Sequence, residues 1–339
     1  MNITALTYIQ GHIRLLAPGI MVSLVVAIAV TFLSQQYHAP VMLLALLLGM
    51  SLNFLSTDAK CKPGIEFSAR TLLRIGVALL GMRITLEQIT GLGWKPAVLI
   101  AILVVATIGV SVVAAKALGF QRSFGMLTGG ATAICGASAA LALSAALPNH
   151  PLKERATLFT VIGVSALSTV AMILYPMIAT WAELSPHDAG VFLGATIHDV
   201  AQVVGAGYSM SHETGDTATV IKLLRVAMLL PVIACAVMIA RMQNGEGFKG
   251  KRPPLLPWFA TGFVILAGLN STGWVPPLVQ AAFVDLSHGC LVVAIGALGM
   301  KTQLKELRSV GVRPILLIIG ETLFLMTLAL GFLKAQLLH

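Results

Sequence analysis

Apolar runs follow one another along almost the whole chain, and most of them are long enough to cross a membrane. A helix needs roughly 20 apolar residues to span the hydrocarbon core of a bilayer. Hydrophobic residues make up 57% of the 339 residues, charged residues only 10%, and the mean hydropathy is +0.92. This leaves too little polar surface to cover a soluble globule. We therefore predict an all-α polytopic membrane protein that forms a single integral membrane domain over residues 1–339, with about eleven hydrophobic segments near residues 17–34, 40–55, 67–82, 96–118, 123–147, 156–179, 188–209, 217–240, 256–272, 276–300 and 312–333.

Two stretches far apart in the chain repeat each other. Residues 80–96 align without a gap with residues 298–314, and the alignment places Gly93 on Gly311. Duplicated halves in a membrane protein are typical of transporters, because two related half-structures can expose one shared site to each side in turn. The first repeat half is predicted at residues 17–147 and the second at residues 156–333. An odd number of crossings separates the two copies, so the repeat is predicted to be inverted.

Basic residues gather in the loops between the apolar runs. Retention of positive loops in the cytoplasm explains them, and with them the net charge of +9, without a nucleic-acid partner. The same rule places the basic segments 241–252 and 301–313 in the cytoplasm and the uncharged turn 273–276 outside. Strict alternation of crossings then conflicts with the connection 181–188, which has no Lys or Arg.

The conflict with strict alternation disappears if the two Gly-rich segments, residues 123–147 and 188–209, do not cross the membrane. If each enters and leaves the membrane on the same face, the basic residues around them all become cytoplasmic. If both segments cross, two loops break the rule. The sequence leaves both alternatives open for the residues concerned, which are Lys116, Arg122, Lys153 and Arg155.

The first Gly-rich segment is predicted to contain a broken helix. Gly costs about 1 kcal/mol relative to Ala in a helix interior, and unwound backbone is tolerated at membrane depth only where protein buries it or a wet cavity adjoins it. The freed N–H groups and the half-helix dipole can hold an anion. Close helix packing through small residues explains the same composition equally well. The candidate anion ligands are Gly129, Gly130, Thr132, Cys135, Gly136 and Ser138.

The second Gly-rich segment repeats the Gly-Ala-Thr of residues 130–132 at residues 194–196 and then carries three polar side chains. His198 and Gln202 are four residues apart and are predicted to share a helical face, with Asp199 beside them. Ionisable groups at this depth usually face a cavity or a transport pathway. A structural hydrogen-bonded cluster that ties helices together is the alternative.

Three further ionisable residues lie within apolar runs. Lys222 and Arg225 are three residues apart; they are either an ordinary helix-end pair that reaches toward the membrane surface or a source of positive charge for an anion site. Glu321 is either a proton carrier or the partner of an arginine such as Arg74.

Residues 134–139 (Ile-Cys-Gly-Ala-Ser-Ala), 198–203 (His-Asp-Val-Ala-Gln-Val) and 222–226 (Lys-Leu-Leu-Arg-Val) together resemble the YeiH-like family of bacterial inner-membrane proteins, which are described as sulfate exporters. The resemblance covers nearly the whole chain. One departure is Ala133, where the family leads us to expect a hydroxyl residue. The resemblance implies a location in the bacterial inner membrane and membership of the superfamily of cation:proton antiporters and anion transporters. It also implies an inverted repeat that builds a scaffold and a mobile core with broken helices, and by analogy a homodimer.

These observations lead to the hypothesis of a secondary active transporter that exports a small oxyanion by alternating access. The anion, sulfate-like or sulfite-like, would sit between the backbone amides of residues 129–138 and the side chains of His198 and Gln202, with Lys222 or Arg225 supplying charge. Asp199 would repel an anion, so Asp199, with His198 and Glu321, is predicted to carry a coupling proton or sodium ion.

Other functions remain open alternatives. A cation:proton antiporter or a carrier of organic anions fits the same architecture. An intramembrane enzyme would use Cys135 as nucleophile, His198 as base and Asp199 to orient it, but neighbouring residues of one helix point about 100° apart. A channel or scaffold is the third alternative. No spacing of Cys predicts a metal site, and no cofactor is expected. Besides the anion and the coupling ion, the expected partners are membrane lipid and a second copy of the chain.

Overall fold

The computed structural model describes a helical protein, with no strand in the part of the chain that it describes. That part comprises residues 3–37, 39–85, 87, 93–147, 152–244, 258–302 and 312–335. Helices cover all of the predicted apolar runs, which confirms the all-α fold class. Six of the described helices are long and apolar enough to cross a membrane, namely Arg14–Tyr37 (the apolar part of α1), Lys95–Ala117, Lys153–Trp181, His212–Ala236, Pro277–Lys301 and Val312–Lys334.

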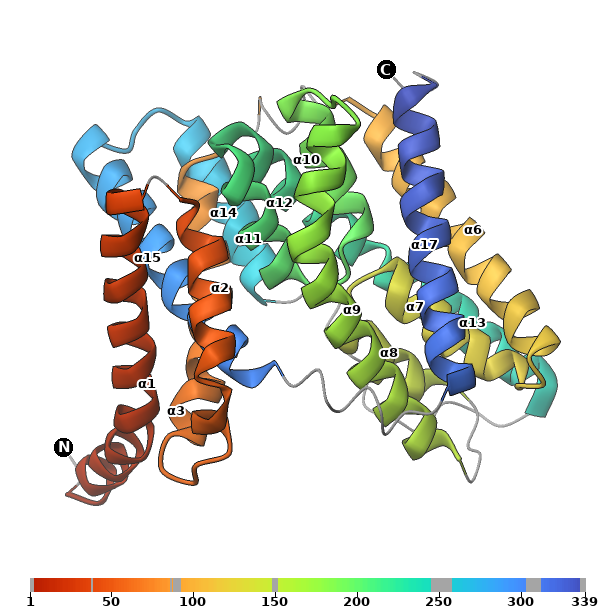
Figure 1. Cartoon of the computed structure of the whole chain (residues 1–339), viewed down its shortest axis with the longest axis horizontal. Coiled ribbons are helices and arrows are strands. Elements are labelled where there is room, and N and C mark those ends of the chain that lie inside the picture. Colours follow the sequence, from red (N-terminus) through yellow and green to blue (C-terminus); the bar gives the residue numbers. More distant parts are fainter. Residues whose placement is uncertain are drawn as a thin grey trace. The chain divides into compact units, whose positions relative to one another are not determined.

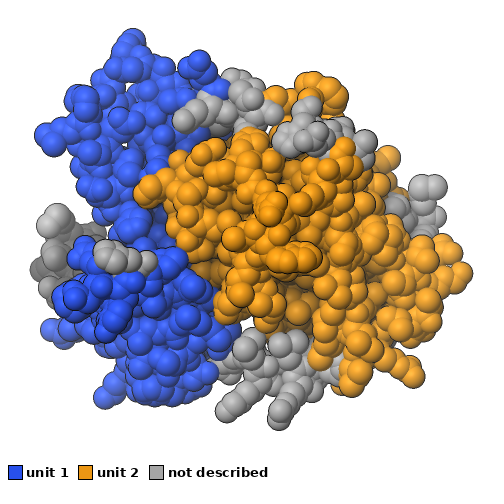
Figure 2. All heavy atoms as spheres, turned by 45° about the horizontal axis from the view of Figure 1, so that its top comes forward, with its two compact units in different colours: residues 1–91, 257–303 blue, residues 92–256, 304–339 orange. Residues whose placement is uncertain are grey.

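The chain divides into two compact units, coloured separately in Figure 2. Unit 1 contains residues 1–91 and 257–303, and unit 2 contains residues 92–256 and 304–339. Each unit therefore draws on both predicted repeat halves, 17–147 and 156–333. The halves themselves stay a prediction, because a compact unit is not the same division of the chain as a sequence repeat.

Unit 1 is organised around the helix α15 (Pro277–Lys301), which packs against α1, α2 and α4. Close approach of backbones holds these helices together. A Cβ atom on Gly49 would lie 2.2 Å from the carbonyl oxygen of Gly296, and one on Gly299 would lie 2.4 Å from that of Leu46. Such contacts between small residues are a main way for helices to associate in membranes. The other elements of unit 1 are α1 (Ile3–Tyr37), α2 (Val41–Ser51), η1 (Asn53–Ser56), α3 (Lys62–Phe67), η2 (Ser68–Leu72), α4 (Leu73–Leu79), η3 (Leu80–Met82) and α14 (Trp258–Ser271).

Unit 2 holds all the candidate site residues and combines long helices with four short ones. The long elements are α6 (Lys95–Ala117), α9 (Lys153–Trp181), the consecutive pair α12 (His212–Ala227) and α13 (Leu229–Asn244), and α17 (Val312–Lys334). The short ones are α7 (Arg122–Ala133), α8 (Ala137–Ala146), α10 (Pro186–Thr196) and α11 (Val200–Met210). Figure 1 shows α7 and α8 in the lower part of this unit and α10 and α11 in its upper part.

The pair α10–α11 doubles back on itself. The hydroxyl of Thr214, at the start of α12, donates to the carbonyl of Pro186, at the start of α10, over 3.0 Å. Gly207 near the end of α11 packs against Gly215 of α12. The start of α10 and the end of α11 therefore lie at the same end of the unit, and the segment 188–209 is re-entrant.

The pair α7–α8 has the same form. Gly130 of α7 lies against the side chain of Leu143 of α8, where a Cβ atom would meet Leu143 Cδ1 at 2.3 Å. The carbonyl of Leu147, just after α8, accepts a hydrogen bond of 2.8 Å from the ammonium group of Lys153 at the start of α9. Both Gly-rich segments thus fold as hairpins of two half-helices, which is the geometry expected of the re-entrant alternative rather than of a crossing.

The helices that follow the two repeat copies run in opposite directions. In Figure 1, α6 descends from the end of unit 2 at which α17 finishes, whereas α17 rises toward it. This antiparallel arrangement is the one predicted for an inverted repeat. The basic segments 241–252 and 301–313, on which the predicted orientation rests, lie largely outside the described residues.

Candidate functional site at the meeting point of two re-entrant hairpins

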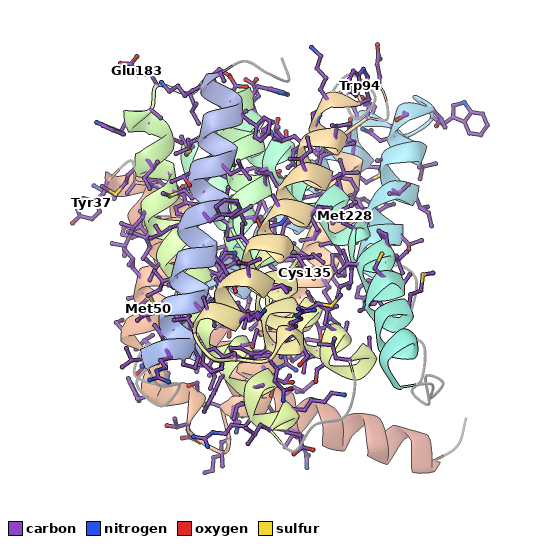
Figure 3. All side chains as sticks on the ribbon, turned by 90° about the vertical axis from the view of Figure 1, so that its right-hand side faces the viewer. Tyr37, Met50, Trp94, Cys135, Glu183 and Met228 are labelled. Atoms are coloured by element: carbon purple, nitrogen blue, oxygen red, sulfur yellow. The ribbon has the colours of Figure 1, made fainter. Side chains whose placement is uncertain are left out.

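The two hairpin tips meet inside unit 2. The first tip is residues 134–136, between α7 and α8, and the second is residues 197–199, between α10 and α11. A Cβ atom on Gly136 would lie 3.5 Å from Cβ of His198, so the tips are in contact. Figure 3 places Cys135 of the first tip midway along the helices of the unit, far from Trp94 and Glu183 at one end. The predicted breaks therefore bring the two candidate segments together.

Gly136 is required by the backbone of the first tip. Its φ of +62° lies in the left-handed region that side chains with a Cβ atom rarely adopt. Two other candidate residues serve packing. A Cβ atom on Gly129 would lie 2.4 Å from Cβ of Ser111 in α6, and Gly130 accommodates Leu143 of α8. For these two glycines the contacts match the close-packing interpretation of the sequence.

Lys222 and Arg225 of α12 bind the carbonyl groups of both tips. The ammonium group of Lys222 donates to the carbonyls of Ile134 (2.7 Å), Ile197 (2.9 Å) and His198 (2.5 Å). Both side chains are almost completely buried, so neither is a helix-end charge that reaches toward water. A buried ammonium group with three carbonyl partners has all of its donors satisfied.

Arg225 repeats this arrangement one helical turn further along α12. Its guanidinium group donates to the carbonyls of Thr132, Ala133 and Ile197, the last at 2.9 Å from Nη1. The carbonyls belong to the ends of α7 and α10, where a helix has unpaired acceptors and the negative end of its dipole. The two cations thus neutralise two helix ends that would otherwise face each other with like charge.

The opposite sides of the tips, where α8 and α11 begin, are more open. Ser138 is exposed and Ala137 half-buried at the start of α8, and Asp199 and Val200 are half-buried at the start of α11. Asp199 caps its own helix by accepting from the N–H of Ala201 over 2.9 Å. No side chain caps α8, whose N-cap is Gly136. The first turn of α8 therefore offers backbone N–H groups and the positive end of a dipole without an acidic residue of its own.

His198 and Gln202 point to different helices, which corrects the prediction that they share a face. His198 precedes α11, and its Nε2 lies 3.0 Å from the hydroxyl of Thr322 in α17. The amide of Gln202 bonds to α9, where Ser168 donates to Oε1 (2.7 Å) and Thr169 accepts from Nε2 (3.2 Å). The break in the helix separates the two side chains.

Glu321 of α17 is buried among hydroxyl groups. Its carboxylate accepts from Ser111 of α6 and from Thr128 (2.7 Å) and Thr132 (3.0 Å) of α7. The arginine partner considered as an alternative, such as Arg74, is not among its described partners. Because Thr132 also offers its carbonyl to Arg225, this one residue links the carboxylate to the guanidinium group.

Cys135 is buried at the first tip, and the described contacts do not arrange it as a nucleophile. His198 Nε2 contacts Thr322, and Asp199 bonds to backbone of its own segment. Neither makes a described hydrogen bond to the thiol. The described residues contain no group of three or more His, Cys, Asp or Glu side chains placed to hold a metal ion.

Sequence reasoning missed most of the hydroxyl residues that complete the site, although it named Thr132. Thr322 is next to Glu321, and Thr128 is four residues before Thr132 on α7, so a search for hydroxyls at helical spacing would have found both. Ser111 follows Thr107 by four residues, and Ser168 is next to Thr169, which follows Ser165 by four, so the same search would have found these hydroxyl residues as well.

Sequence comparisons with known proteins agree with this architecture. Residues 18–318 match the family model described as conserved hypothetical protein 698. The chain is 54% identical over 315 residues to a UPF0324 membrane protein of Chlorobaculum tepidum, covering 93% of this chain and 88% of that protein. It is also 51% identical over 318 residues to the UPF0324 membrane protein TauZ of Paracoccus denitrificans, covering 93% and 94% of the two chains.

The chain belongs to the UPF0324 membrane protein family. This confirms the expected relationship to the YeiH-like proteins, and together with the six described helices that are long and apolar enough to cross a membrane it supports a multi-pass membrane protein. A third UPF0324 protein, from Rhizobium meliloti, is 48% identical over 309 residues, covering 91% of this chain and 90% of its own. Placement of the UPF0324 family in the superfamily of antiporters and anion transporters stays a prediction.

Proposed function

We propose that the protein is a secondary active transporter that exports a small oxyanion, such as sulfate or sulfite, by alternating access. The observation that carries this proposal is the meeting of two re-entrant half-helix hairpins deep in unit 2. Irregular backbone at membrane depth is found where it lines a cavity or is buried in protein, and transporters place it at the substrate site. A resident cofactor has no role in this proposal, nor does an enzymatic reaction.

The anion would bind at the first turn of α8. The N–H groups of Ala137 and Ser138 would donate to its oxygens, His198 would lie beside it, and Lys222 and Arg225 would supply a positive field from behind the tips. Lys222 and Arg225 act at a distance in this scheme because their donors already bind backbone carbonyls. Cys135 and Gly136 shape the tip, and Gln202 fixes the second hairpin to α9.

A coupling ion, either a proton or sodium, would bind to the carboxylates. Asp199 is half-buried at the second tip and Glu321 is buried behind the first. These two groups also support the second candidate function, a cation:proton antiporter. The two functions differ in the ligand that binds at α8, so they can be separated by experiment. A homodimer is proposed by analogy alone.

A substitution at Ser138 tests the anion site without disturbing the fold. Asp at this position would place a fixed carboxylate at the first turn of α8, where it competes with an anion but favours the helix dipole. We expect Ser138→Asp to abolish uptake of radiolabelled sulfate and sulfite into proteoliposomes while the melting temperature is unchanged or higher. Ser138→Ala, the matched control, keeps the backbone N–H groups and should transport at close to the wild-type rate.

Ligand binding provides the accompanying measurement. A ligand at one hundred times its Kd stabilises the folded state by about 2.7 kcal/mol, so sulfate or sulfite should raise the melting temperature of the wild type and of Ser138→Ala but not of Ser138→Asp. If neither anion shifts the wild type and sodium does, the cation:proton antiporter is the better description. If Ser138→Asp transports sulfate as fast as the wild type, the anion does not bind at the first turn of α8.

A further inference from the structure

Glu321 is a buried carboxyl group whose described hydrogen-bond partners are all hydroxyl groups. Its side chain lies near the middle of α17 and is only 2% exposed. Ser111 and Thr128 contact Oε1, the second over 2.7 Å, and Thr132 contacts Oε2 over 3.0 Å. An ionised carboxylate buried without a cation beside it is costly at membrane depth, and ionisable groups there mark proton and ion pathways. Glu321 is therefore a candidate for a group that changes its charge during transport.

The hydroxyl groups around Oε1 each have a second acceptor within reach. The hydroxyl of Ser111 lies 2.6 Å from the carbonyl of Gly125 as well as in contact with Glu321. The hydroxyl of Thr128 lies 3.2 Å from the carbonyl of Phe124. A hydroxyl group carries one hydrogen and can also accept. Each of the two therefore donates either to the carboxyl group or to a backbone carbonyl.

Both charge states of the carboxyl group can be hydrogen-bonded with the same positions of the heavy atoms. When Glu321 is ionised, Ser111 and Thr128 donate to Oε1. When Oε1 carries a proton, it donates to the oxygen of Ser111, and Ser111 turns its own hydrogen to the carbonyl of Gly125. A sodium ion, in contrast, would have to enter between oxygen atoms that are already within hydrogen-bond distance of one another. The cluster thus fits a proton better than sodium.

Few other titratable groups lie near this carboxyl group. Thr132 links it to Arg225, which binds the carbonyl of the same residue, and the next residue of α17 contacts His198. Cys135 lies at the adjoining first tip. Of the helices that pack against α17, which are α6, α7, α9 and α10, only α9 carries a titratable side chain away from its ends, Tyr175. The charged residues of these four helices all lie in first or last turns.

The net charge around the two tips depends on the proton of Glu321. Lys222 and Arg225 contribute two positive charges and Asp199 one negative charge, with His198 counted as neutral. An ionised Glu321 cancels the remaining positive charge, whereas a protonated Glu321 leaves it in place. Charges act on one another strongly in a low-dielectric interior. A proton on Glu321 therefore favours an anion at the first turn of α8.

We propose that Glu321 is the coupling site of the transporter and that its ion is a proton, which moves in the same direction as the anion. A hydronium ion gives its proton to Oε1 and forms an O–H bond there; when the anion is released, the proton returns from Oε1 to water. Exchange with water takes place in another state of the transport cycle, because the carboxyl group is buried in this one. This inference rests on the proposed function and specifies its coupling, since each ligand favours binding of the other by the same factor.

The experiment uses purified full-length protein in proteoliposomes, with radiolabelled sulfate outside and a pH-sensitive dye inside. Sulfate is the probe because it stays a dianion across the pH range of the experiment. For the wild type, inward sulfate flux should acidify the lumen, and it should do so equally when potassium replaces sodium on both sides. The half-saturating sulfate concentration should rise with pH, by up to about tenfold per pH unit, since one proton is bound with each anion.

Three substitutions separate Glu321 from other carboxylates. Gln imitates the protonated carboxyl group, because it is uncharged and offers one donor and one acceptor in the same shape. Glu321→Gln should therefore bind sulfate at high pH as tightly as the wild type does at low pH, and it should move no protons. Asp199→Asn keeps an acceptor for the N–H of Ala201 and should still move one proton with each sulfate ion. Glu154→Gln, which changes an exposed residue at the start of α9, is the matched control and should keep the wild-type pH dependence.

The outcomes distinguish the inference from the function on which it rests. Sulfate flux by the wild type without lumen acidification, or flux that requires sodium, overturns the proton coupling and leaves the transporter in place. The same holds if Glu321→Gln, with a melting temperature equal to that of the wild type, keeps its pH-dependent sulfate binding. If Glu321→Gln does not fold, Asp199→Asn decides, because loss of proton movement in that variant assigns the proton to Asp199 instead. If the wild type transports neither sulfate nor sulfite at any pH, the proposed function itself fails and the coupling with it.

Discussion

At the scale of single residues, the hydrogen-bond partners of Lys222, Arg225 and Glu321 differ from those that the sequence suggested. Lys222 and Arg225 were correctly singled out, but a pair three residues apart gives no indication that backbone carbonyls satisfy them. Their partners lie 24 to 93 residues away along the chain. Glu321 is similar, because its partner Ser111 is 210 residues away. The sequence shows which groups are costly in a membrane, and only the fold shows what they bind.

Removing Lys222 should damage the fold more than removing an ordinary lysine. Lys222→Met leaves three buried carbonyls without this donor, and each unsatisfied group costs about 1–3 kcal/mol. We expect the melting temperature in detergent to fall clearly, by about 5 °C or more. Lys116→Met, which removes an exposed lysine from the last turn of α6, should change it little. If Lys222→Met has the same melting temperature as the wild type, Lys222 does not stabilise the fold through these three carbonyls.

At the scale of elements, the broken helices followed from the sequence but their path did not. The glycines of the first segment indicated a break there, whereas the break of the second segment at residues 197–199 was not located, because His198 and Gln202 were predicted to share one helical face. Whether the half-helices continue or double back depends on distant contacts, such as that between Pro186 and Thr214. The missing Lys and Arg in the connection 181–188 gave an indirect hint, because re-entry removes the conflict in loop charge.

The packing of α10 on α12 makes a prediction for one glycine. A Cβ atom on Gly194 would lie 2.6 Å from the carbonyl oxygen of Ala218 and 2.7 Å from Cβ of Ile221. Gly194→Ala should therefore push α10 away from α12 and lower both the melting temperature and transport. Gly109 of α6 faces open space. Gly109→Ala should therefore leave the melting temperature unchanged or raise it, because Ala favours a helix over Gly by about 1 kcal/mol. Equal stability of the two variants would argue against this close contact.

At the scale of the whole molecule, the two ends of unit 2 differ in charge. The end at which α7–α8 opens carries Lys116, Arg122, Lys153 and Arg155 with the acidic Glu154, and the end at which α10–α11 opens carries Glu183, Asp188, Glu213 and Asp216 with the basic Lys95 and Lys334. The positive-inside rule assigns the first end to the cytoplasm. The sequence supplied these charges, but the interleaving of the chain into two units was visible only in the structure.

Cysteine labelling tests this orientation and the re-entrant hairpins together. In a background with the four native cysteines replaced by serine, Glu183→Cys and Glu213→Cys should react with a membrane-impermeant maleimide in intact cells. Arg122→Cys and Glu154→Cys, which bracket α7–α8, should react only after permeabilisation. If Arg122→Cys and Glu154→Cys react from opposite sides, α7–α8 crosses the membrane and the hairpin is wrong.

The six hydrogen bonds from α12 to the hairpin tips and to the end of α7 also constrain how the protein can move. Separating the tips would strip buried carbonyls of their donors inside the membrane, where each unsatisfied group costs several kcal/mol. Both hairpins and α12 are therefore expected to travel as one rigid body. For the proposed transporter, this predicts an elevator cycle, in which the substrate moves together with its binding site, rather than a gate that opens between the two tips.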